Sequence, residues 1–167
     1  LYLYLEKQNF NTFDGIIGFA TNEQTQNIVF NGYIDLVLNN NLNYGEQFVL
    51  KYKADGADQE SLSLKTQLPY LFKTPLGIQA ELNIFRRDST FSSASQSLNV
   101  SYQISPSSKA QIGIVAKTSN ELLSENQNLE NLQDFSSSFL TTGVTFIKFQ
   151  QNTLFPVKTF LNLDIGI

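Results

Sequence analysis

Residues 76–84 read LGIQAELNI, and their side chains alternate strictly between apolar and polar. Successive side chains of a β-strand point to opposite sides, so a period of two indicates a strand with two unlike faces. The apolar set comprises Leu76, Ile78, Ala80, Leu82 and Ile84, and the polar set comprises Gly77, Gln79, Glu81 and Asn83. The stretch therefore predicts a strand that lies between an apolar and an aqueous environment.

The same period recurs along most of the chain. It is clear at residues 28–39, 97–104 and 161–167, and similar strands are predicted at 48–54, 60–72, 110–118 and 139–149. Residues 15–22 form a weaker candidate, and residues 121–135 have room for a helical turn or two inside a loop. The pattern predicts an all-β fold of successive antiparallel strands.

The connections between these strands differ in length. Residues 73–75 and 105–108 read as tight turns, whereas the alternate connections, 86–95 and 119–138, are long and polar. Outer-membrane barrels have short periplasmic turns and longer external loops. We therefore expect an antiparallel transmembrane β-barrel whose strand at residues 15–22 runs outward from the periplasmic side.

The composition excludes several classes of function. The chain has no Cys, His, Met or Trp, so Cys/His zinc sites, disulfides, thiol nucleophiles and a Ser-His-Asp triad are absent. We expect no catalytic residue, no metal and no cofactor. The net charge of −4 and the lack of a basic block argue against nucleic acid as a partner. With no Met and an alternating stretch directly at Leu1, we expect the chain to be part of a longer protein.

Alternation alone leaves open which face meets lipid. A soluble lipocalin-like barrel would turn its apolar face inward. Three features favour a membrane barrel: charged residues make up only 16% of the chain, against roughly 25% in ordinary globular proteins, the polar face is rich in Ser, Asn and Gln, and aromatic residues gather near strand ends. The carboxylates Asp35, Glu81 and Asp164 are then interpreted as positions in a wet lumen.

Four segments resemble a known family. They are LYLYLEK with FDGIIGFATN (1–7 and 13–22), NNNLNYGEQ (39–47), QESLSLKTQLPYLF (59–72) and NTLFPVKTFLNLDIG (152–166). In this order they resemble the surface-antigen barrel superfamily, the outer-membrane assembly factors that include BamA and TamA. The chain departs from the family pattern at two places. Only Gly45 remains of the two glycines in the second segment, and residues 157–159 replace the usual Thr-x-Gly of the fourth.

The resemblance implies a domain organisation and a cellular place. Residues 1–12 would be the last strand of a periplasmic POTRA module with its linker, and residues 13–167 the N-terminal part of a larger barrel of about sixteen strands. The barrel would lie in the outer membrane with its N-terminus on the periplasmic side. Its expected partners are outer-membrane lipid, nascent outer-membrane proteins and accessory assembly subunits.

The resemblance also implies a function and its residues. An assembly factor would open a lateral seam at its first strand and receive a client strand there; the alternative is a two-partner secretion pore or a porin. The seam would be formed by Gly15, Ile16, Ile17, Gly18, Phe19 and Ala20. The family's turn and strand-end motifs would be represented by Asn39, Gly45, Pro69, Tyr70, Phe155 and Pro156. A purely structural interpretation competes with this one, because glycine in a strand often relieves crowding and proline often marks a strand end.

Overall fold

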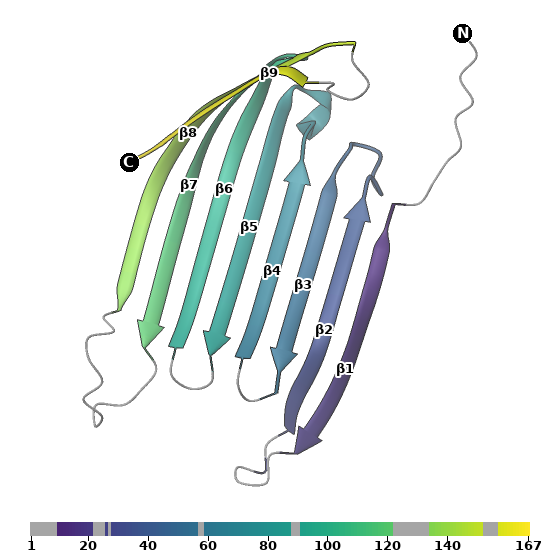
Figure 1. Cartoon of the computed structure of the whole chain (residues 1–167), viewed down its shortest axis with the longest axis vertical. Coiled ribbons are helices and arrows are strands. Elements are labelled where there is room, and N and C mark those ends of the chain that lie inside the picture. The colour runs from purple at the N-terminus through teal and green to yellow at the C-terminus, as the bar shows by residue number, and fades with distance from the viewer. Residues whose placement is uncertain are drawn as a thin grey trace.

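The computed structural model describes residues 10–21, 26, 28–56, 59–87, 91–121, 134–151 and 157–167, which form one nine-stranded antiparallel sheet (Figure 1). The strands are β1 (Thr12–Thr21), β2 (Ile28–Asn39), β3 (Gln47–Asp55), β4 (Gln59–Leu68), β5 (Leu76–Arg87), β6 (Phe91–Ser105), β7 (Ser108–Glu121), β8 (Phe135–Phe149) and β9 (Val157–Gly166). A short 3-10 helix, η1 (Leu71–Lys73), lies between β4 and β5. The predicted all-β antiparallel architecture is confirmed. No helix in the described ranges is long and apolar enough to cross a membrane.

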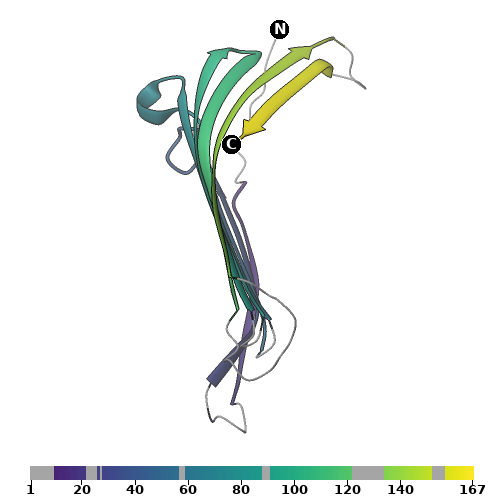
Figure 2. The ribbon, with the colours of Figure 1, turned by 90° about the vertical axis from the view of Figure 1, so that its left-hand side faces the viewer.

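The strands follow one another in chain order across the sheet, from β1 at one edge to β9 at the other. The sheet is a single layer, and it bends over at β8 and β9 (Figure 2). Of the described hydrophobic residues, only Ala54 is buried. The fold therefore has no core of its own, and its apolar side chains must be covered by something outside this sheet.

The register divides the sheet into two unlike faces. Side chains of directly paired residues lie on the same face. One row of pairs runs through Leu36, Leu50, Leu64 and Leu82. The neighbouring row, displaced by one residue, runs through Asp35, Lys51, Ser63 and Asn83. The predicted apolar and polar faces are thus continuous across the central strands.

The sheet bends toward its polar face at β7 to β9. Gln111 of β7 donates a hydrogen bond of 2.8 Å from its Nε2 to Oδ1 of Asp164 on β9, across the intervening strand. Gly143 of β8 lies between them, and a Cβ there would be only 1.9 Å from the Asp164 oxygen. On the opposite face, Ile112 and Ile114 remain 53% and 56% exposed. The concave side is polar and the convex side apolar, which is the reverse of what a soluble barrel requires.

The apolar band crosses the strands obliquely. The row that contains Leu82 continues to Gln96 on β6 and Ala116 on β7, so it leaves the apolar region. On β6 the apolar side chains, Leu98 and Val100, lie closer to the turn at the end of that strand. If this apolar band lies parallel to the plane of a membrane, the strands must be tilted, as they are by about 35–45° in outer-membrane barrels.

The connections correct part of the prediction. Ser105 and Ser108 are paired, so the expected tight turn between β6 and β7 is confirmed. Residues 86–95 are not a long loop, because β5 and β6 remain paired out to Arg87 and Phe91. Serines are typical of turns, yet those at 92, 93 and 95 lie inside β6. The expected tight turn at 73–75 is also longer, since β4 ends at Leu68.

These corrections weaken the difference between the two ends of the sheet. At one end lie the connections 40–46, 69–75, 106–107 and 150–156, and at the other lie 22–27, 56–58 and 88–90 together with the longest connection, 122–134. The difference in connection length between the two ends of the sheet now depends mainly on residues 122–134.

Candidate functional site

The predicted seam strand, β1, is an edge strand. It is paired with β2 along its whole length, from Thr12 opposite Val37 to Thr21 opposite Ile28. Among the described residues, no strand lies on its other side (Figure 1). An edge strand presents alternate backbone N–H and C=O groups that can pair with another strand. The structure therefore brings Gly15, Ile16, Ile17, Gly18, Phe19 and Ala20 together on one open edge.

The side chains of β1 point to both faces. Phe13, Ile17 and Phe19 lie on the apolar face and are 72%, 58% and 79% exposed. Ile16 lies on the polar face, opposite Tyr33, and is 67% exposed. The strand thus has apolar side chains on both faces.

Glycines bring the backbones of β1 and β2 close together. A Cβ at Gly15 would be 2.9 Å from the carbonyl oxygen of Tyr33, and one at Gly18 would clash with the side-chain oxygen of Asn31. The strongest requirement lies at Gly32 of β2, which pairs with Ile17. Gly32 has a φ of +129°, and a Cβ there would be 1.9 Å from the carbonyl oxygen of Ile16.

Sequence reasoning missed Gly32 because it fits the apolar alternation of residues 28–39 without a break. The signal that could have found it is the residue type itself, since glycine inside a strand often marks close backbone approach. Its partner, Ile17, could not be read from the sequence because the register depends on pairing between strands.

Like charges face each other across the same pair of strands. Asp14 is directly opposite Asp35 on the polar face. The hydroxyl of Tyr33 donates to Asp14 Oδ2 at 3.1 Å, and Lys51 Nζ lies 3.5 Å from Asp35 Oδ2. Each carboxylate has a partner, but like charges directly opposite one another weaken strand pairing.

The predicted turn motif at Asn39 and Gly45 closes β2 onto β3. Gly45 has a φ of +73°, and its N–H donates to Oδ1 of Asn40 at 2.8 Å. The Glu46 carboxylate accepts the backbone N–H groups of Leu42 and Tyr44. These bonds, first of all the one from Leu42, hold the pKa of Glu46 below its usual value. The segment is a closed polar turn with a conformational requirement for glycine.

The second predicted motif marks a strand end. β4 ends at Leu68, so Pro69 and Tyr70 begin the connection to β5. Proline has no N–H to donate to a neighbouring strand, which explains why pairing stops there. The prediction that residues 60–72 form one strand is wrong beyond Leu68. Phe155 and Pro156, like residues 1–7, lie outside the described residues.

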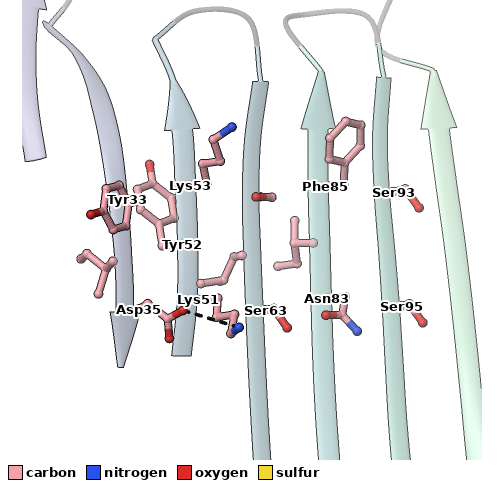
Figure 3. Close-up of a pocket in the computed structure, with 14 residues that line it drawn as sticks. Tyr33, Asp35, Lys51, Tyr52, Lys53, Ser63, Asn83, Phe85, Ser93 and Ser95 are labelled. Atoms are coloured by element: carbon pink, nitrogen blue, oxygen red, sulfur yellow. Dashed lines mark ion pairs between the residues drawn. The ribbon is translucent and has the colours of Figure 1, made fainter. Parts of the chain in front are cut away.

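A shallow hollow of about 580 Å³ lies on the polar face over β2 to β6 (Figure 3). Tyr33 and Phe85 are among the residues that line it, and Lys51 of β3 forms an ion pair with Asp35 on the adjacent strand β2. Four serines, Ser61, Ser63, Ser93 and Ser95, line part of it, and Ile34, Leu62 and Ile84 also contribute to the lining. The hollow is open and is lined by both polar and apolar residues.

The three carboxylates interpreted as lumen positions are separate from one another. Asp35 pairs with Lys51, Glu81 accepts a hydrogen bond of 2.8 Å from Asn83, and Asp164 accepts from Gln111. In the described ranges, no three acidic side chains come together as possible metal ligands.

The comparisons with known proteins concern the fold. No family profile and no curated protein matches the sequence. The structure is similar to the crystal structure of BamA from Haemophilus ducreyi lacking POTRA domains 1–3, with a TM-score of 0.55 and 12% sequence identity. The match covers 95% of this chain and 34% of that one. At this identity the likeness shows the fold alone: the sheet resembles about a third of the BamA chain, consistent with a partial barrel.

Proposed function

We propose that this chain forms the first part of the wall of an outer-membrane β-barrel that inserts other barrel proteins through a seam at β1. The observation that carries the proposal is the position of β1. It is fully paired with β2 on one side, has no strand of the described residues on the other, and lies at the start of a sheet similar to part of the BamA structure. Exposed backbone groups in a bilayer cost several kcal/mol each, so such an edge must pair with another strand.

The mechanism would be β-augmentation. An incoming client strand would pair its backbone with the open edge of β1, and no covalent step, nucleotide or metal would be needed. Gly15 and Gly18 contribute no side chain to the packing of β1 on β2. A strand with few such contacts opens at a lower free-energy cost than a central strand.

The proposal includes the surroundings of the sheet. The convex apolar face would contact outer-membrane lipid, and the concave polar face would line the lumen. Residues 1–12 would lead from a POTRA module on the periplasmic side, where accessory assembly subunits would bind. Nascent outer-membrane proteins would be the clients.

A secretion pore or porin is the second candidate, favoured by the polar concave face and its serine-lined hollow. In that case the lumen would be the path, and the edge of β1 would stay closed. The two functions differ in whether β1 must separate from the strand that closes the barrel.

The test is a disulfide across the seam of the full-length protein. A cysteine at Ile17 or Phe19 is paired with a facing cysteine on the closing strand, and the insertion of client barrels is measured before and after reduction. We expect insertion to stop in the oxidised protein and to recover on reduction. The matched control is a disulfide between β4 and β5 at Ser63 and Asn83, which are directly paired and distant from the seam. Normal insertion with the seam locked would refute the proposal and favour the pore.

A further inference from the structure

A cluster of amide side chains binds the start of β1 to the turn between β2 and β3. The backbone N–H of Asn39 donates to Oδ1 of Asn11 at 2.7 Å, and Nδ2 of Asn39 donates to the carbonyl oxygen of Phe10 at 2.7 Å. Nδ2 of Asn11 donates to Oδ1 of Asn41 at 2.7 Å, and Nε2 of Gln47 donates to Oδ1 of Asn39 at 2.8 Å. We call Asn11, Asn39, Asn41 and Gln47 the asparagine clamp. It joins three strands at one end of the sheet.

The other half of β1 is held differently. Beyond Gly15, two successive pairs on the apolar face each contain a glycine, Gly15 with Ile34 and Ile17 with Gly32. Glycine offers no side chain for cross-strand packing, so these pairs depend on backbone hydrogen bonds. The next pair on that face, Phe19 with Phe30, is aromatic, so the weak packing is limited to the two glycine-containing pairs. The pair between Asp14 and Asp35, which adds like-charge repulsion, lies between these two pairs and the clamp.

This uneven attachment matters if β1 opens as proposed above, on which this inference rests. A strand with an opening seam on one side and weak packing on the other has two ways to separate. It can leave the closing strand and stay on the sheet, or it can peel away from β2. Only the first keeps the edge in register as a template for a client.

We infer that the asparagine clamp positions β1 by deciding which of its two sides opens. Within the described part of the chain, its hydrogen bonds link the start of β1 to β2 and to the turn before β3 and to nothing on the open side. They therefore stabilise the attachment of β1 to the sheet. The clamp holds the end of the strand nearest the N-terminus, and opening then occurs between β1 and the closing strand.

Hydrogen exchange of the full-length barrel in lipid vesicles tests the inference without any client. Asn11→Ala removes the acceptor for Asn39 N–H and the donor to Asn41. We expect the amides of residues 12–16 and 33–37 to exchange roughly tenfold faster, as expected for the loss of two hydrogen bonds, while β5 keeps its rate. Insertion of client barrels should slow although the barrel stays folded.

Two further variants separate positioning from general damage. Asn11→Asp keeps the acceptor and loses only the donor, so the amides of residues 12–16 and 33–37 should exchange faster by a smaller factor than in Asn11→Ala. If Asn11→Ala does not fold, the exchange of Asn11→Asp alone tests the inference. Asn162→Ala is the matched control, because Asn162 belongs to a similar polar network on β9, where it accepts from Thr145 at 2.8 Å. Asn162→Ala should leave the exchange of β1 and β2 unchanged.

Unchanged exchange at β1 and β2 in both Asn11 variants, or an equal rise at β5, would overturn the inference. Failure of the proposed function would look different. In that case the seam disulfide would leave insertion normal, while the exchange results would still report whether the clamp holds β1 to β2.

Discussion

The pairing of β1 with β2 and the pairing of β4 with β5 are equal in length and unequal in side chains. Each comprises ten antiparallel residue pairs. On the apolar face of the second, Leu64 is opposite Leu82. On the apolar face of the first, Ile17 is opposite Gly32. Backbone pairing is therefore similar in both places, and we expect any difference in stability between them to come from the side chains.

The polar faces differ in the same direction. Lys65 is directly opposite Glu81 between β4 and β5, whereas Asp14 is directly opposite Asp35 between β1 and β2. Cross-strand pairs contribute about 0.2–1 kcal/mol each, with the sign set by the charges. From these pairs we expect β1 to be held on β2 less strongly than β4 is held on β5, with the asparagine clamp as the exception at one end.

The largest effect is expected from a charge on the apolar face of the central pair of strands. Leu82→Arg would place a guanidinium in lipid and lower the free energy of unfolding by about 2–4 kcal/mol if it lies at the bilayer midplane. Urea titration of the barrel in vesicles, followed by far-ultraviolet circular dichroism, measures this change.

Asn83→Arg, on the opposite face, is the control and should cost far less. Equal tolerance of the two substitutions, or the reverse order, would mean that the faces are exchanged and that a soluble barrel with an apolar interior is the better account.

The division of the sheet into an apolar and a polar face could largely be predicted from the sequence, because side-chain alternation depends only on neighbouring residues. The limits of residues 28–39 agree with those of β2, and the apolar and polar sets of residues 76–84 occupy the two predicted faces. The serines at 92, 93 and 95 predict a loop because their preference for turns is also local, whereas their pairing with β5 depends on residues far along the chain. The close approach at Gly32 and the clamp at Asn11 depend on register, which alternation does not encode.

A smaller effect is expected at the glycine that distinguishes the edge. Gly32→Ala forces a Cβ against the carbonyl of Ile16 at a positive φ, and backbone strain of this kind costs about 1–3 kcal/mol. The same urea titration should show the lower free energy of unfolding, and hydrogen exchange should show that the destabilised strands are β1 and β2. For Gly166→Ala the nearest atom would be 3.8 Å away, so stability should barely change. A fully tolerated Gly32→Ala would remove the main structural reason for a weak edge.

The smallest effects have opposite signs. Asp14→Asn removes the like-charge repulsion, keeps an acceptor for Tyr33, and should stabilise the pairing of β1 with β2 by about 0.2–1 kcal/mol. Glu81→Gln removes an opposite-charge pair and should weaken the pairing of β4 with β5 by a similar amount. Hydrogen exchange of the two pairs of strands, at low and high salt, measures both. The same sign for both variants would contradict the role assigned to charge.

The most direct test asks whether the two faces meet lipid and water as proposed. The chain contains no Cys, so a single cysteine can carry an environment-sensitive nitrobenzoxadiazole label at one known position. Leu64 and Lys65 are the test pair on β4, and Ile17 and Ile16 are the test pair on β1, where both residues are isoleucine and only the structure assigns the faces. In vesicles with brominated acyl chains, the account predicts strong quenching at Leu64 and Ile17 and little at Lys65 and Ile16. Equal quenching within each pair, or stronger quenching at Lys65 and Ile16, would contradict it.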